Sequence, residues 1–346
     1  MKYTRALILC FVTLAFASCE RVFMEDDAPN KPVDVFDYLW TKLDQQYAFF
    51  DVKGIDWDSV YEVYRPKVND NMGNDSLFRV CANMLNTLND GHINLISNFD
   101  VSHNDSLYYK MIAHRNIDAE VVTLNYLKVN YHTTGSFTHN AIRNGRVAYI
   151  RYSSFENEVS ASALSYLVSH YKNCYGLILD MRQNGGGSMD NVHGILSLFD
   201  NHKQPLYRTQ IKSGPEHDAF TELETVYASD SSMLGSNCWH KPVAVLIDRG
   251  SYSATSFFAL CTQAYDNVKL FGDDTGGGLG LPNGGALPNG WTYRFSITRS
   301  IALDGGNYEN GVPPDVRVIL DPTCTAQGVD NVIETAADWI LGLLGI

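Results

Sequence analysis

Ser253 lies in a segment whose order of residue types suits a reactive hydroxyl, residues 244–258 (AVLIDRGSYSATSFF). Its apolar start predicts a buried strand, Gly250 predicts a tight turn, and residues 254–263 predict a helix. The first turn of a helix has unpaired N–H groups and the positive end of the helix dipole, and both favour developing negative charge. A nucleophilic serine needs such surroundings. The same pattern is also that of a helix merely capped by Ser253 and Thr255.

Residues 177–187 (LILDMRQNGGG) hold a second group of chemical interest, three consecutive glycines after an apolar strand. Glycines at a strand exit let backbone N–H groups approach a ligand closely. No Gly-Lys-Ser/Thr follows and the G-x-G-x-x-G spacing is missing, so neither a P-loop nor a dinucleotide site is indicated. Two uses remain open, which are to hold a phosphate and to donate hydrogen bonds to an oxyanion.

His92 has the most distinctive setting of the ten histidines. It follows the turn signal Asn89-Asp90-Gly91 and precedes a short predicted strand at residues 93–96. An imidazole at such a turn can act as a general base near neutral pH. A structural histidine satisfied by hydrogen bonds within the turn is the alternative on this pattern alone.

The composition is globular, and it limits the partners that the chain can have. Of 346 residues, 45% are apolar and 12% aromatic, enough for one large domain or two ordinary ones. The net charge of -13, with basic residues scattered, argues against nucleic acid or an anionic membrane surface as the main partner. Five cysteines follow Cys10 and Cys19 in an odd, widely spaced set without disulfide or metal-ligand spacing. We expect no metal and no cofactor.

The first 19 residues have the features of an export signal. Lys2 and Arg5 precede an apolar run at residues 6–16, and small residues then precede Cys19. The run is too short to span a bilayer, and its end resembles a bacterial lipoprotein signal with Cys19 lipidated after cleavage. Ordinary secretion with cleavage near Cys19 is the alternative. Residues 1–18 are thus predicted to be the signal peptide and 19–34 a tether.

The elements that would position these groups follow from the spacing of apolar residues. Helical spacing predicts a small N-terminal helical domain at residues 35–100. Residues 101–144 form a connecting segment in which 121–131 alternates like a strand. From residue 145 to 346, strands alternate with helices around the glycine loop, which is typical of an α/β core with buried parallel strands.

Later parts of that core are less regular. No element is predicted in the polar stretch 203–240, and the glycine-rich residues 276–290 are interpreted as a mobile segment. Strands are predicted at 291–298 and 316–320, and a closing helix at 329–344.

Taken together, four segments resemble the C-terminal processing peptidase family, which includes tail-specific proteases and the core of tricorn. They are LNDGH at 88–92, LILDMRQNGGG at 177–187, GSYSATSFF at 250–258 followed by TGGG at 275–278, and ENGVPPD at 309–315. They occur in the family's order and cover nearly the whole chain after residue 35. The resemblance implies an α/β core with a mixed sheet and a ClpP/crotonase-like spiral, preceded by the small helical domain.

The resemblance also assigns roles to individual residues. The family's nucleophile falls on Ser253. The lysine of its lysine-dyad branch would stand where this chain has Gly278, so the dyad is absent. The tricorn-like branch uses a histidine and a late acidic residue, which match His92 and Glu309, but the serine that supports its histidine is replaced by Gly91.

These matches predict a serine-type peptidase. Ser253 would attack the peptide carbonyl, His92 would transfer the proton, and Glu309 would orient the imidazole. Backbone N–H groups of Gly186 and Ala254 are the predicted oxyanion donors, with Gly185 as the alternative.

The expected partner is a peptide or an unfolded protein of the cell envelope. The lipid at Cys19 is the only expected contact of this protein with the membrane. Residues 99–145 are too few for the PDZ domain that many family members carry, so none is expected. Two other functions stay open. One is a catalytically inactive relative that binds a peptide or an apolar ligand, and the other is an anchored scaffold without a ligand.

Overall fold

The computed structural model describes residues 29–104, 107, 113–199, 202–229, 234–235, 237–343 and 345. The predicted signal peptide, Cys19 and most of the predicted tether lie outside these ranges. The helical region begins at Pro32, earlier than expected, because a proline in the first helical position forfeits no backbone hydrogen bond. Within the described ranges, no helix combines the length and apolar character needed to cross a bilayer.

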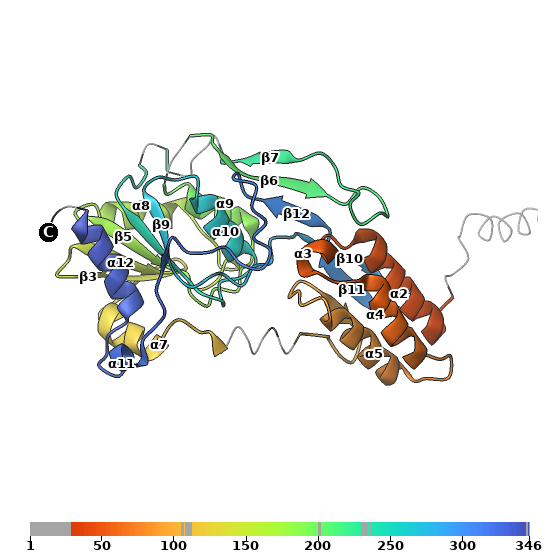
Figure 1. Ribbon diagram of the computed structural model, residues 1–346. Coiled ribbons are helices and arrows are strands. Elements are labelled where there is room, and N and C mark those ends of the chain that lie inside the picture. Colours follow the sequence, from red (N-terminus) through yellow and green to blue (C-terminus); the bar gives the residue numbers. More distant parts are fainter. Residues whose placement is uncertain are drawn as a thin grey trace, which may run out of the picture.

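The N-terminal region is helical, as predicted. Its helices are α2 (Pro32–Gln46), α3 (Phe50–Lys53), α4 (Trp57–Tyr64), a short 3-10 turn η1 (Arg65–Lys67) and α5 (Asn74–Asn86). Their apolar faces share one core with four residues from much later in the chain, Leu287, Trp291, Tyr293 and Phe295. The helical unit is therefore completed by the C-terminal half (Figure 1).

Tyr293 and Phe295 belong to a small antiparallel sheet in the order β1 (Asn94–Ile96), β11 (Thr292–Ser296) and β10 (Pro282–Ala286), and Leu287 and Trp291 lie in the connection between β10 and β11. The interpretation of 276–290 as a mobile segment is wrong for β10, which pairs along its whole length with β11. Its glycines are a packing requirement, because a Cβ on Gly284 or Gly285 would lie within 2.6 Å of Tyr293 atoms.

The core is a seven-stranded mixed sheet, which confirms the α/β class. Its order is β13 (Val316–Arg317), β9 (Val268–Gly272), β8 (Val243–Ile247), β5 (Gly176–Asp180), β4 (Val147–Arg151), β3 (Phe137–Ile142) and β2 (His132–Thr134). The five strands from β13 to β4 are parallel, and β3 and β2 continue the sheet antiparallel.

Helices cover both faces of the main sheet (Figure 1). Alternate side chains of the buried strands belong to one or the other of the two cores beneath these helices. Leu177 and Leu179 of β5 lie in the core that includes α8 (Ala161–His170), α9 (Met189–Leu196) and α10 (Ala254–Thr262). Between them, Ile178 points to the opposite core, formed with α12 (Asn331–Gly342) and the π-helical turn η2 (Val122–Leu127). Burial on both faces explains why these strands are continuously apolar.

Two further parts of the sequence interpretation are wrong. The predicted strand at 121–131 is helical as far as Leu127, with α7 (Ala119–Val121) leading into η2, because the Asp118 carboxylate caps the first turn by accepting from two N–H groups. The stretch 203–240 contains β6 (Pro205–Ile211) and β7 (Glu224–Tyr227), which form a three-stranded sheet with β12 (Thr298–Ile301). This sheet is mostly half-exposed, so its residues lack the apolar alternation that would predict strands. The short helix α11 (Pro322–Thr325) completes the elements.

Candidate active site

Three loops of the site leave neighbouring parallel strands at the same edge of the sheet. The glycine loop 185–187 follows β5, the Ser253 turn follows β8, and the second glycine loop 276–280 follows β9. Because β5, β8 and β9 are adjacent and parallel, their carboxyl ends converge, as is usual for ligand sites of α/β sheets.

Ser253 has a strained backbone, with φ 55° and ψ −120°, immediately before the first residue of α10. The Ser253 N–H donates to the Gly277 carbonyl over 2.9 Å, and its own carbonyl accepts from Phe257. A non-glycine residue in this region costs of order 1–3 kcal/mol, so the surrounding loops must enforce the conformation. The result is a sharp turn from strand to helix that presents the hydroxyl, as in the nucleophile elbows of other hydrolases.

His92 reaches this hydroxyl from the N-terminal region. The Asp90 carboxylate accepts from the His92 backbone N–H over 2.8 Å and thereby shapes the turn before β1. The imidazole Nε2 lies 2.9 Å from Ser253 Oγ, although the two residues are 161 positions apart. Burial lowers the pKa of His92 below its ordinary value, with Arg294 acting in the same direction. A neutral imidazole is the form that can accept a proton.

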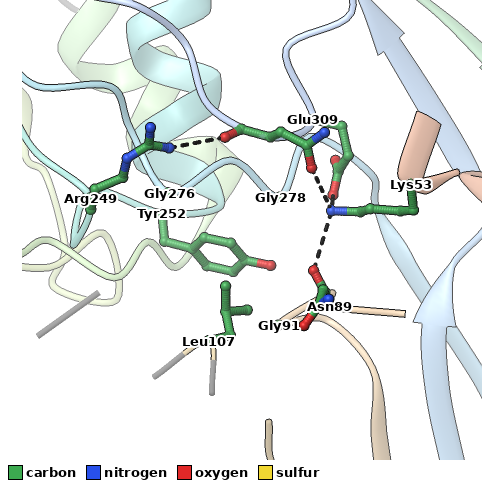
Figure 2. A pocket seen from close by; sticks show the side chains of 10 residues that line it. Lys53, Asn89, Gly91, Leu107, Arg249, Tyr252, Gly276, Gly278 and Glu309 are labelled. Carbon is green, nitrogen blue, oxygen red and sulfur yellow. Dashed lines mark hydrogen bonds and ion pairs between the residues drawn. The ribbon is translucent and has the colours of Figure 1, made fainter. Parts of the chain in front are cut away.

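Glu309 is near this pair but does not contact the imidazole. Its Oε2 accepts from the Leu279 N–H over 2.7 Å, and its Oε1 lies 3.4 Å from the Lys53 ammonium (Figure 2). His92 Nδ1 is buried and has no hydrogen-bond partner among the described residues. The expectation that Glu309 orients the imidazole by direct contact is therefore not met in this conformation.

What Glu309 holds instead is the second glycine loop. Its backbone carbonyl accepts from Gly278 N–H, and its carboxylate from Leu279 N–H. These are the two residues directly after Gly277, whose carbonyl accepts from Ser253 N–H. Burial, together with the nearby Asp90, raises the pKa of Glu309 to about 8, and Lys53 opposes this shift. The side chain lines a cavity of about 290 Å³ that is separated from the reactive serine by Tyr252.

The predicted oxyanion donors are close to the serine, but the prediction that Gly186 N–H is a donor needs a correction. The Gly186 N–H already donates to Asn184 Oδ1 over 3.0 Å, so it is not a vacant donor. Among the described residues, the N–H groups of Ala254 and Gly185 have no acceptor. Gly186 instead allows the glycine loop to lie close to the nucleophile, since a Cβ at this position would lie 2.9 Å from Ala254 N and 2.9 Å from Ser253 Cβ.

A cleft of about 570 Å³ opens over the serine. Its walls include the glycine loop, Glu156, Met189, Leu281, Pro282 and Arg294. Arg294 is held at the rim by the His92 carbonyl and by Asn94 Oδ1. In the described ranges, no cluster of three or more His, Cys, Asp or Glu side chains has an arrangement that could hold a metal ion.

Sequence reasoning missed four residues that surround the reactive pair, namely Tyr47, Lys53, Asp90 and Tyr252. The Tyr47 hydroxyl donates to Asp90 Oδ2 over 2.9 Å, and Lys53 also reaches Asn310. Burial raises the pKa of Tyr47 well above its ordinary value, as it does for Tyr252. Asp90 belongs to the turn Asn89-Asp90-Gly91 that precedes His92, so the sequence offered a signal for it. The spacing of Tyr47 and Lys53 does not distinguish them from ordinary core and surface residues.

A strained serine at a helix start, in contact with a histidine and beside vacant N–H donors, is the arrangement of the serine hydrolases. The chain matches Peptidase family S41 over residues 146–318 and the Tricorn protease C1 domain over residues 29–86. A candidate peptidase of Parabacteroides merdae ATCC 43184 has a similar crystal structure, with 37% identity and a TM-score of 0.84 over 90% of this chain and 98% of that chain. The chain belongs to peptidase family S41, a family of serine peptidases.

More distant relatives have the same fold. The Photosystem II D1 C-terminal processing protease is 16% identical, with a TM-score of 0.52 over 87% of this chain and 97% of that chain. The carboxy-terminal processing protease CtpA of Bacillus subtilis (strain 168) is 24% identical over 185 residues, which are 53% of this chain and 37% of that protein. The matched segments are 37% of the length of this CtpA and 34% of the length of a CtpA-like serine protease of Staphylococcus aureus (strain N315), so the chain spans only about a third of these two relatives.

Proposed function

We propose that this protein is an active serine peptidase that cleaves peptide bonds in exported or cell-envelope proteins. The observation that carries the proposal is the 2.9 Å contact between His92 Nε2 and the hydroxyl of the strained Ser253, at the floor of a cleft. The predicted signal peptide and the lipid at Cys19 would hold the enzyme at the membrane surface of the cell envelope. We also propose that residues 101–144 form no PDZ domain, so that the cleft itself would select the substrate.

In this mechanism Ser253 Oγ attacks the peptide carbonyl while His92 Nε2 takes the hydroxyl proton. The carbonyl oxygen becomes an oxyanion that Ala254 N–H stabilises at the start of α10, with Gly185 N–H as the second donor. His92 then delivers the proton to the leaving amine, and water releases the acyl group by the same steps in reverse order. Glu309 supports the reaction by holding the loop that bonds to the Ser253 backbone.

Covalent labelling tests the nucleophile. A fluorophosphonate probe is expected to add one adduct to the wild type, located on Ser253 by peptide mass spectrometry, and none to Ser253→Ala. Ser153→Ala is the control, since this exposed serine lies outside the cleft and its variant should label like the wild type. Labelling of Ser253→Ala at the wild-type rate would refute the assignment.

A second candidate is a family member that binds peptides without cleaving them. The buried Nδ1 atom of His92 favours it, because this atom has no hydrogen-bond partner among the described residues, whereas catalytic imidazoles are normally held at this nitrogen by a carboxylate. The absence of any adduct, together with saturable binding of an unstructured peptide by the wild type, would establish this alternative.

A further inference from the structure

Tyr252, the residue before the nucleophile, fills space that two glycines leave open (Figure 2). A Cβ on Gly91 would lie 2.9 Å from the Tyr252 hydroxyl, and a Cβ on Gly278 would lie 2.5 Å from its Cζ atom. Any side chain at either position would therefore push the ring away. Glycine is required both on the turn that carries His92 and on the loop next to Ser253 because the ring lies between them.

The backbone of Tyr252 is fixed by the turn that strains Ser253. Its N–H donates to the Asn184 carbonyl over 3.0 Å, its carbonyl accepts from Thr255 over 3.0 Å, and the residue forms a parallel bridge with Gly277. The position of the aromatic ring is consequently tied to the position of the nucleophile.

The ring packs against the imidazole of His92. Their centroids are 5.2 Å apart, and the planes are inclined by 56°. The hydrogen bond to Ser253 is formed at Nε2, while Nδ1 has no hydrogen-bond partner among the described residues. A hydrogen bond at one nitrogen alone leaves the imidazole free to turn about its Cβ–Cγ bond unless packing prevents it.

The two nearby carboxylates, Asp90 and Glu309, do not hold the imidazole in place. Asp90 accepts from the His92 backbone and from the Tyr47 hydroxyl, and Glu309 is occupied by Leu279 and Lys53. Among the described residues, the imidazole therefore has the Ser253 hydroxyl, a backbone interaction with Gly280 and the aromatic ring of Tyr252 as its neighbours. Of these, the ring is the neighbour whose packing can restrict rotation of the imidazole.

We propose that Tyr252 is the positioning residue of the general base, and that its ring holds the His92 imidazole toward Ser253 in the role that a hydrogen-bonded carboxylate has in other serine peptidases. This inference rests on the proposed function. Contacts between aromatic rings stabilise particular relative orientations beyond the effect of burial, and the Tyr252 ring can therefore favour one orientation of the buried imidazole.

The test compares Tyr252→Leu, which keeps apolar volume but removes the aromatic face, with Tyr252→Phe, which keeps the face but removes the hydroxyl. Peptide hydrolysis and crystal structures are measured for both variants and for the wild type. For Tyr252→Leu we expect kcat to fall about 100-fold with KM within about threefold, because a displacement of about 1 Å costs this much. Its crystal structure should show His92 Nε2 beyond hydrogen-bonding distance of Ser253 Oγ, whereas Tyr252→Phe should keep the contact and most of kcat.

The proposal is overturned if Tyr252→Leu keeps the contact between His92 and Ser253, or if Tyr252→Phe loses the contact as Tyr252→Leu does, since the hydroxyl would then be responsible. The crystal structures decide this even if the wild type hydrolyses no peptide. In that event the proposed peptidase function fails, while the positioning of the imidazole is still measured.

Discussion

Replacing Gly186 by alanine tests how the site accommodates an oxyanion. The added Cβ would lie 2.7 Å from the Tyr252 carbonyl oxygen and 2.9 Å from Ala254 N, and the residue has φ +100°, which is strained for any L side chain. The methyl group would crowd the vacant N–H of Ala254, where the oxyanion is expected to bind. Loss of one such donor lowers kcat about 100- to 1,000-fold, and the backbone strain should lower the free energy of unfolding by about 1–3 kcal/mol.

Gly185→Ala is the matched comparison in the same loop. A Cβ at this position meets no atom within 4 Å and the residue has no positive φ, while the substitution preserves its N–H group. We expect kcat to fall less than about tenfold. Steady-state hydrolysis of an unstructured peptide gives kcat, and urea unfolding followed by circular dichroism gives stability. The reasoning is refuted if Gly186→Ala retains kcat within threefold, or if Gly185→Ala loses as much.

Two further predictions concern ionisation. Because burial lowers the pKa of His92, the acidic limb of the profile of kcat/KM against pH should lie below the ordinary value of 6.5. Arg294→Met should move this limb upward, because the substitution removes a positive charge. A limb above 6.5 in the wild type would contradict the prediction. The pKa of Glu309 is raised from 4.5 to about 8, so the folded state holds its proton more tightly than the unfolded state does. This contribution to stability is complete below about pH 4.5 and is lost as the pH rises to about 8. In urea unfolding measured against pH, Glu309→Gln should therefore lose less stability over this range than the wild type does. Identical profiles for the two proteins would count against the raised pKa of Glu309.

Much of the architecture could be predicted because local patterns and the final environment agree. The parallel strands β5 and β8 are continuously apolar since helices cover both faces, and the glycine loop marks the exit of β5. Helices with one apolar face, such as α2 and α12, were placed within a few residues. Strands β6 and β10 escaped detection, because β6 is half-exposed and β10 is rich in glycines that fit around Tyr293.

The sequence shows the residue types of the site and their order: a serine at a helix start, a histidine after a tight turn and glycines at strand exits. It could not determine which atoms meet, because a contact between His92 and Ser253 depends on how two separate units pack. Tertiary structure alone decided that Glu309 bonds to Lys53 and Leu279, that Gly186 N–H is already occupied, and that Tyr252 lies against the imidazole. Hydrogen bonds and ring contacts form within a few tenths of an ångström, and that precision comes from packing in three dimensions.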